Sequence, residues 1–387
     1  MSCRNDKEPT RRYHAGCCVK SVHEMGSMRS ADLALIKSLC KHVLPTAWTE
    51  ALSRSPWLKR WRNRWAGRVY CCRALQGESN YNICVNCDMT VSCHCRDYDA
   101  SGHIGDLNAQ SLDAIFSGET ACRFRRRLAR GKYAIAACPD CGDLRSIPKR
   151  DAARYLDSFH APEQGIMVEN TVLCNLNCIG CNSKQVAKTR RQVRMSLADI
   201  TRVAEMLHTC AIREVTFHNL GEPFLSATVH EELSILRRLN PGITIVCSTN
   251  GLCIESETQR GAALMADHLY FSIDGPSQEV VTRYQVNGDF ARAFANMRNL
   301  VSVRDDRGLA KPIIEWKYVV FRWNDEPRYV ERAVELAREA RIDQISFWLG
   351  GGLPSQVSRR FLHDPYFQQL GTASWKGREI ILRQHSA

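Results

Sequence analysis

One short run of residues constrains this chain more than any other part of it. It reads Cys174-Asn175-Leu176-Asn177-Cys178-Ile179-Gly180-Cys181 and follows an apolar stretch at residues 166–168. Three cysteines at this spacing can converge on one metal centre. Thiolates hold iron–sulfur clusters, and a cluster of four irons normally takes four cysteine ligands. Three ligands leave one iron with an open coordination position, which is what chemistry at a metal requires.

The alternative interpretation is a zinc site, or three unrelated buried cysteines. Short cysteine pairs are common in zinc modules, which usually supply a fourth cysteine or histidine nearby. Neither residue type follows Cys181 here until His208. The spacing, together with the motifs further along the chain, favours an iron–sulfur cluster.

The run resembles the cluster motif of the radical S-adenosylmethionine (SAM) superfamily. In that family three cysteines hold a 4Fe-4S cluster, and the amino and carboxylate groups of SAM chelate its open iron. The resemblance implies that Cys174, Cys178 and Cys181 are the ligands of a SAM-binding cluster. The family often has an aromatic residue before the last cysteine, whereas this chain has Gly180 there.

Length and composition set the broad class of the protein. A chain of 387 residues, 44% hydrophobic and 24% charged, is ordinary for a soluble protein of two or three domains. Residues 1–14 are polar, so no signal peptide is expected, and no run approaches the ~18 apolar residues of a membrane span. We therefore expect a cytoplasmic protein whose 19 cysteines are cofactor ligands and buried thiols rather than disulfides.

A basic N-terminal segment, residues 1–70, contributes much of the net charge of +12. We expect residues 1–29 to be disordered and residues 31–44 to be helical. A second helix is predicted near Pro56, and it carries tryptophans on one face and flanking basic residues: Trp57, Trp61, Trp65, Lys59, Arg60, Arg62 and Arg64. The favoured interpretation packs the tryptophans on a neighbouring domain. The alternative is contact of residues 55–68 with an anionic membrane. No specific nucleic-acid partner is expected.

Residues 71–150 form a second cysteine-rich module. Short β-prone runs at 81–85 and 90–95 predict a hairpin, and helical patterns follow at 111–116 and 122–130. The module resembles the SPASM/twitch auxiliary-cluster domain of radical SAM enzymes, although in most members that domain follows the core. The resemblance implies an auxiliary 4Fe-4S cluster held by Cys72, Cys93 or Cys95, Cys138 and Cys141. The choice between Cys71 and Cys72 stays open, and a zinc ribbon is the alternative.

Strands and helices alternate over residues 160–350, which is typical of parallel α/β units. The predicted strands are residues 165–171, 214–217, 243–248, 268–273, 313–321 and 344–348. The predicted helices are residues 197–209, 228–239, 257–266, 290–303 and 328–341. The fold class is thus α/β, a partial (β/α)6 TIM-like barrel preceded by a small α+β cysteine-rich domain. Residues 351–387 are a C-terminal tail without a recognisable motif.

Polar motifs fall where the predicted strands end, which is where such barrels carry their chemistry. Gly221-Glu222-Pro223 follows the second strand, Ser248-Thr249-Asn250-Gly251 the third, and Asp274-Gly275 the fourth. By resemblance the first engages the SAM amino group, while Ser248, Asn250 and Asp274 occupy positions that contact the SAM carboxylate and ribose. The glycine-rich loop at 350–354 should lie near the same site.

Strand alternation sorts further residues by face. Cys247 should point outward, whereas His218 and Glu169 should look into the barrel. On the fifth strand Glu315 and Lys317 share the inner face, with Arg322 and Asn324 at the rim. We predict that Glu315 and Lys317 are catalytic, binding substrate or moving protons. A structural ion pair is the alternative.

The resemblance implies an oxidoreductase-type enzyme that reductively cleaves SAM to a 5′-deoxyadenosyl radical. A flavodoxin- or ferredoxin-type donor would supply the electron. We expect the radical to abstract hydrogen from a polar small molecule, sugar-like or another metabolite, in a net oxidation or epimerisation. One alternative is a maturase that modifies a ribosomal peptide. Another is a zinc-containing nucleic-acid-binding protein.

Overall fold

The computed structural model describes residues 55–79, 81–351, 355–370, 374–375 and 378–383. The chain divides into two units between Lys59 and Arg60, and nearly all the described residues belong to the second. The predictions for residues 1–29 and 31–44 lie outside the described residues. Within the described ranges, no helix has both the length and the apolar character needed to cross a membrane.

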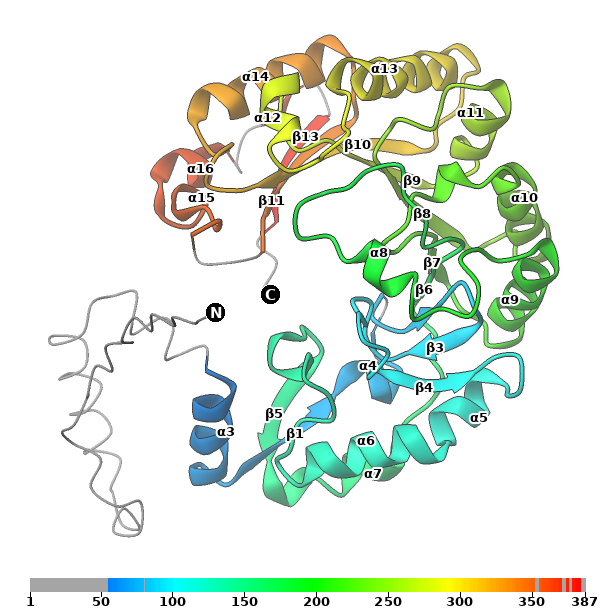
Figure 1. Ribbon diagram of the computed structural model, residues 1–387, viewed down its shortest axis with the longest axis vertical. Helices are drawn as coiled ribbons and strands as arrows, with labels where there is room; N and C mark the ends of the chain where they lie inside the picture. Colours follow the sequence, from blue (N-terminus) through cyan, green and yellow to red (C-terminus); the bar gives the residue numbers. More distant parts are fainter. Residues whose placement is uncertain (1–54, 80, 352–354, 371–373, 376–377, 384–387) are drawn as a thin grey trace, which may run out of the picture. The chain divides into compact units, whose positions relative to one another are not determined.

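Six parallel strands stand side by side in chain order at the centre of the large unit (Figure 1). They are β6 (Ile166–Val168), β7 (Glu214–Thr216), β8 (Thr244–Thr249), β9 (His268–Ser272), β10 (Ile313–Val320) and β11 (Gln344–Leu349). Their main helices are α9 (Leu197–Thr209), α10 (Val229–Leu239), α11 (Glu257–Ala263), α13 (Phe290–Asp306) and α14 (Pro327–Glu339). The sheet runs on past both β6 and β11 without closing. The predicted partial barrel of six β/α units is confirmed.

Local sequence explains where these elements begin and which face they bury. Helix α9 begins at Ser196, whose hydroxyl accepts a hydrogen bond from the backbone N–H of Asp199, and such a cap is worth about 1 kcal/mol. On β10, Trp316 and Tyr318 are fully buried. Alternate residues of a strand face opposite sides, so the side chains between them face the inside of the barrel.

The cysteine-rich module continues the barrel sheet. Strand β2 (Cys84–Val85) pairs in parallel with β6, and β3 (Thr90–Ser92) and β4 (His103–Asp106) follow as antiparallel strands. The predicted hairpin is therefore present. A separate two-stranded sheet joins β1 (Arg68–Cys72) to β5 (Leu144–Pro148). Helices α5 (Leu112–Ser117) and α6 (Glu119–Ala129) complete the module.

The tail adds structure at the opposite edge of the sheet. Two short helices, α15 (Arg359–His363) and α16 (Pro365–Leu370), lead to β12 (Ser374–Trp375) and β13 (Arg378–Arg383). Strand β13 pairs in parallel with β11. Together with β2 on the other side, it extends the run of parallel strands beyond the six that sequence predicts.

Candidate functional site

The cysteine loop leaves the end of β6 and is held from two sides. The Glu222 N–H donates to the carbonyl oxygen of Leu173 at 2.8 Å, and the Ile179 N–H donates to the carbonyl of Tyr284 at 2.9 Å. Gly180 has a φ of +87°, in the left-handed region that favours glycine. The loop's turn before Cys181 therefore explains why glycine stands where the family often has an aromatic residue.

The three thiols of this loop interact with one another. Cys174 and Cys178 are half-buried and Cys181 is exposed. Burial raises the pKa of Cys174 to about 11, and the nearby Cys181 thiol adds to that rise. Burial also raises the pKa of Cys178, with Asp274, Cys174 and Cys181 contributing. Cys174 and Cys178 are thus protonated at neutral pH and must lose their protons to bind metal.

The three cysteines are not arranged as the ligands of a single metal ion. Among the side chains that the structure describes, no group of three or more His, Cys, Asp or Glu is arranged to hold one metal ion. In a 4Fe-4S cluster each cysteine binds a different iron, so the ligands stand farther apart than those of one ion. Three neighbouring thiolates with no fourth ligand in their loop suit a cluster with one open iron.

Gly221 and Glu222 connect the loop after β7 to the cysteine loop. A Cβ atom on Gly221 would lie 2.0 Å from the carbonyl oxygen of Thr171, so only glycine fits there. The buried Glu222 carboxylate accepts hydrogen bonds from the backbone N–H of Asn250 at 2.7 Å and from the Thr249 hydroxyl at 2.8 Å. Burial raises the pKa of Glu222 to about 7, and these hydrogen bonds oppose the rise.

Asn250 brings the loop after β8 into the same place. Its side-chain N–H donates to Asn175 Oδ1 at 2.7 Å, and its Nδ2 lies 3.8 Å from Cys174 Sγ. Beside it is a very small pocket, lined in part by Leu176, Asn250, Ile273, Gln285 and Phe290. Ser248, two residues earlier on β8, is half-buried.

Asp274 lies where β9 ends and is buried. Its Oδ1 accepts a hydrogen bond from the Val319 N–H at 3.0 Å. Burial raises the pKa of Asp274 to about 7, opposed by the Val319 N–H and the Lys317 charge. Asn324 donates to the Asp274 carbonyl at 3.0 Å and is fully buried. Asn324 lies just past the end of β10 and uses its amide to hold the backbone there, whereas Arg322 is exposed.

Glu315 and Lys317 share the inner face of β10, as strand alternation predicts. Glu315 is fully buried and accepts hydrogen bonds from His268 Nε2 at 2.8 Å and from the Ser346 hydroxyl. Lys317 Nζ lies 4.4 Å from the ring centroid of Trp348, a cation–π contact.

His218 lies near this lysine. Burial and the Lys317 charge lower the pKa of His218 to about 3, and its buried Nδ1 has no hydrogen-bond partner. Sequence reasoning missed His268, Ser346 and Trp348. These three residues could have been found by applying the alternation of strand faces to β9 and β11 as well as to β10.

The cysteines of the N-terminal module separate into two faces. Cys72 packs in the main core, whereas Cys71 packs on the other side of β1 with Val69 and Ile147. Burial is the main cause of the raised pKa of Cys93. The charges of Cys72, Cys138 and Cys141 raise it further. The Cys95 thiol instead donates to Asn82 Oδ1 at 3.4 Å.

The chain is similar in part to several known proteins. Residues 168–307 match the family model of the radical SAM superfamily. The GTP 3′,8-cyclase of Chlorobaculum tepidum is 28% identical over 198 residues, which cover 49% of this chain and 56% of the cyclase. Streptococcus suis SuiB bound to S-adenosylmethionine matches with a TM-score of 0.42 and 11% identity, over 57% of this chain and 49% of that one. Native anSMEcpe with bound AdoMet matches with a TM-score of 0.41 and 16% identity, over 56% and 63%.

Proposed function

Because the chain belongs to the radical SAM superfamily through residues 168–307, we propose that it abstracts a hydrogen atom from a polar small-molecule substrate. Members of this family use a 4Fe-4S cluster and SAM. When bound, these supply a 5′-deoxyadenosyl radical that attacks an unactivated carbon. The protein's own residues hold the cluster, orient SAM and the substrate, and exclude water and competing hydrogen donors.

The observation that carries this proposal is the convergence of strand-end loops on the cysteine loop. Gly221 lies against the backbone just before Cys174, and Asn250 donates to a residue inside the cysteine loop. We propose that Gly221, Glu222 and Pro223 engage the SAM amino group, with Ser248, Asn250 and Asp274 on its carboxylate and ribose. A small pocket lies between Asn250 and Leu176, a residue of the cysteine loop.

The inside of the barrel supports a polar substrate. Lys317 supplies a cation there, and His218 presents a neutral imidazole whose Nδ1 has no partner. We propose Lys317 as a substrate-binding residue. Glu315 would keep His268 and Ser346 in place and could move a proton through His268. The 28% identical relative is named a GTP 3′,8-cyclase, and GTP is a polar small molecule. This name supports a small-molecule substrate over a peptide substrate.

The N-terminal thiols support a second, auxiliary cluster. We propose Cys72, Cys93, Cys138 and Cys141 as its ligands, because Cys72, Cys93 and Cys138 are buried in the same core cluster and Cys141 is close enough to contribute to the raised pKa of Cys93. Cys95 would lie next to this group rather than in it. The cluster would accept the electron left on the substrate radical, which would make the reaction a net oxidation, or would relay electrons inward.

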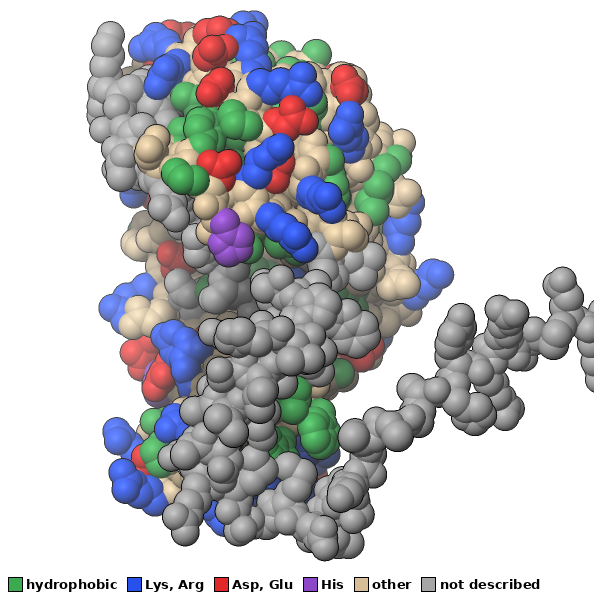
Figure 2. Space-filling model, turned by 90° about the vertical axis from the view of Figure 1, so that its left-hand side faces the viewer, with side chains coloured by type: hydrophobic (Ala, Val, Ile, Leu, Met, Phe, Trp, Pro, Cys, Tyr) green, Lys and Arg blue, Asp and Glu red, His purple; other side chains and the backbone are tan. Residues whose placement is uncertain are grey.

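Two further features concern partners. Basic and acidic side chains are interspersed over the upper part of the face in Figure 2, which on that face does not favour a nucleic-acid-binding surface. Helix α3 (Pro56–Trp65) exposes its tryptophans, and we propose that it contacts an anionic membrane surface.

The test begins with anaerobic reconstitution of the full chain. We expect about eight irons per chain, and release of 5′-deoxyadenosine from SAM after addition of a reductant. Cys181→Ser should abolish release, because it removes one ligand of the SAM-binding cluster. Cys72→Ser should lower the iron content by about four, whereas Cys71→Ser, on the other face of β1, should leave it unchanged. A colourless protein with bound zinc would contradict the proposal.

A further inference from the structure

The segment of residues 188–195, here termed the clasp, connects the two groups of cysteines. It follows α8 (Ser183–Val186), the short helix after Cys181, and returns to the entrance of the same cysteine loop. There the Val172 N–H donates to the carbonyl of Val193 at 3.1 Å, and the Met195 N–H donates to the carbonyl of Asn170 at 2.8 Å. The entrance of the cysteine loop is thus hydrogen-bonded to the clasp, and its exit leads into the clasp through α8.

The other side of the clasp is bound to the β2–β3 hairpin of the N-terminal module and to the end of β4. Arg190 donates to Asn86 Oδ1 at 2.8 Å, and Arg191 donates to Asp106 at 2.7 Å. The Gln192 side chain donates to the carbonyl of Cys87 at 2.6 Å. The hairpin therefore cannot shift without moving the clasp.

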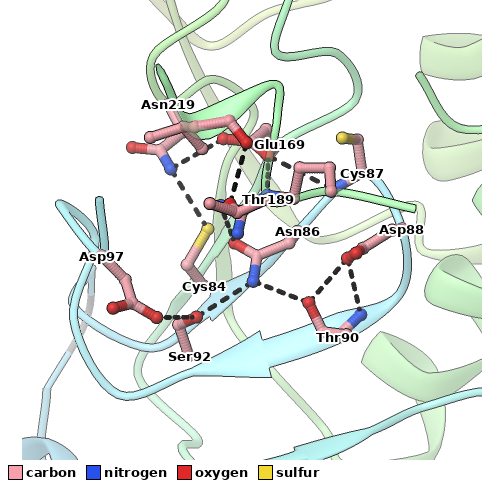
Figure 3. A network of polar contacts seen from close by, with 12 residues as sticks. Cys84, Asn86, Cys87, Asp88, Thr90, Ser92, Asp97, Glu169, Thr189 and Asn219 are labelled. Carbon is pink, nitrogen blue, oxygen red and sulfur yellow. Dashed lines mark hydrogen bonds and ion pairs between the residues drawn. The ribbon is translucent and has the colours of Figure 1, made fainter. Parts of the chain in front are cut away.

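A buried ion pair lies at the centre of this connection. Arg190 Nε is 3.0 Å from Glu169 Oε1, and the two side chains are 1% and 0% exposed. Glu169 follows β6, and its other oxygen accepts a hydrogen bond from Asn219 at 3.0 Å (Figure 3). Moving either charge from its partner would leave a buried charge uncompensated, which is strongly unfavourable. The pair therefore fixes the clasp in one position.

The same network reaches the residues beside Cys93. Asn86 donates to the Ser92 hydroxyl at 3.0 Å, and Ser92 donates to Asp97 Oδ2 at 2.8 Å (Figure 3). Ser92 is the direct neighbour of Cys93 in the chain. A chain of polar contacts thus runs from Ser92, beside Cys93, through Asn86 and Arg190 to Glu169, which precedes the loop that carries Cys174.

We propose that Arg190 and Glu169 are positioning residues that couple the two cysteine groups. Iron bound by Cys72, Cys93, Cys138 and Cys141 restricts the motion of the β2–β3 hairpin. Because the clasp is bonded to both the hairpin and the loop of the SAM-binding cluster, the motion of that loop is restricted as well. The inference rests on the auxiliary cluster of the proposed function. Stated as an equilibrium, metal at one site stabilises the loop at the other site through a shared rigid element.

Hydrogen exchange of residues 170–182 tests the coupling in the full, anaerobically reconstituted chain. Cys138→Ser with Cys141→Ser removes two ligands of the auxiliary site. We expect the iron content to fall by about four and exchange of residues 170–182 to accelerate about fivefold or more. The same two cysteine substitutions should have less effect in a chain that also carries Glu169→Gln and Arg190→Met. There we expect the hydrogen-exchange rate of residues 170–182 to change by less than about twofold, because the link through the clasp is already broken.

A matched control distinguishes a general loss of stability from a loss of the coupling between the two cysteine groups. Arg304 and Asp343 form another largely buried ion pair, and Arg304→Met with Asp343→Asn should leave the fivefold response intact. If the Glu169/Arg190 variant does not fold, Ser92→Ala breaks the same network with a smaller change and should also reduce the response.

The outcomes distinguish a failure of the coupling from a failure of the auxiliary cluster on which it rests. If ligand removal lowers the iron content but leaves exchange of residues 170–182 unchanged, the coupling is wrong while the auxiliary cluster stands. If the iron content does not fall, the auxiliary cluster is wrong and the coupling fails with it. A fivefold response that persists in the Ser92→Ala chain would also overturn the role of this network.

Discussion

Gly221 shows how a single missing side chain shapes the site. The position that a Cβ would take lies 2.0 Å from the Thr171 carbonyl oxygen and 3.0 Å from that of Leu173. Both are backbone atoms, which cannot rotate away as a flexible side chain can. The residue is glycine because two loops, one after β6 and one after β7, pass each other at this point.

We predict that Gly221→Ala displaces the backbone before Cys174. Since a misplacement of about 1 Å can lower a catalysed rate by roughly 100-fold, release of 5′-deoxyadenosine should fall by that order. Gly242→Ala is the matched control, because no atom lies within 4 Å of its Cβ position. Equal rates for the two variants would show that the close approach has no role.

Glu222 predicts a pH dependence of stability. Burial raises its pKa from the ordinary 4.5 to about 7, so the folded state binds the proton more tightly than the unfolded state. Its contribution to stability is fully present below pH 4.5 and is lost as the pH rises through about 7. The loss corresponds to about 3 kcal/mol at most, because each pKa unit is worth about 1.4 kcal/mol.

Urea unfolding between pH 5 and pH 8 measures this contribution. The wild-type protein should lose stability over that range relative to Glu222→Gln, which cannot titrate. The variant should start lower at acid pH, since a glutamine amide faces one of the donors that the carboxyl group accepts. Parallel pH profiles for the two proteins would contradict the assignment of a raised pKa to Glu222.

At the scale of elements, α3 illustrates a side-chain pattern that the sequence left undecided. The favoured interpretation packed its tryptophans on a neighbour. In the structure Trp57, Trp61 and Trp65 are 68%, 36% and 48% exposed, and the helix buries none of its residues. Exposed tryptophans beside lysine and arginine suit the boundary between lipid headgroups and acyl chains.

We therefore predict that the chain binds vesicles that contain phosphatidylserine. Replacement of Trp57, Trp61 and Trp65 by alanine should remove most of this binding, measured by co-sedimentation. Vesicles of phosphatidylcholine alone are the control, and high salt should weaken binding because the basic side chains contribute by charge. Unchanged co-sedimentation of the triple variant would exclude α3 as the contact.

Most of the barrel could be predicted from sequence because its elements are long and periodic. Helix α9 matches its predicted range residue for residue, and β10 shows the expected alternation of faces. Strand β2 could not be predicted as part of the barrel, since only two residues pair with β6. Its place depends on contacts between segments far apart in the chain, such as Arg190 with Asn86.

The candidate site, like the fold, could be predicted from the sequence only in part. The strand-end motifs could be located from sequence because strand ends gather at one edge of a parallel sheet. The partners of Glu315 could not be found alone, because His268 and Ser346 come from two different strands. Likewise, which of Cys71 and Cys72 faces the main core could be learned only from the packing of β1 in the folded chain.

At the scale of the whole molecule, the N-terminal module completes the barrel sheet rather than following it as an independent addition. Strand β2 covers the edge of β6, and the hairpin supplies partners to Glu169 and Arg190. A barrel without the module would expose the hydrogen-bonding edge of β6, which is a template for association with other chains. It would also leave several buried polar groups without partners, each at a cost of about 1–3 kcal/mol.

We predict that a fragment of residues 160–387 is insoluble or aggregated, whereas a fragment of residues 60–387 is soluble and binds iron at both sites. The two fragments differ by the module alone, so their comparison isolates its contribution. Gel filtration under anaerobic conditions distinguishes monomer from aggregate. A monomeric 160–387 fragment with a folded circular dichroism spectrum would mean that the β6 edge is stable uncovered. The clasp would then hold two independent domains together rather than complete one.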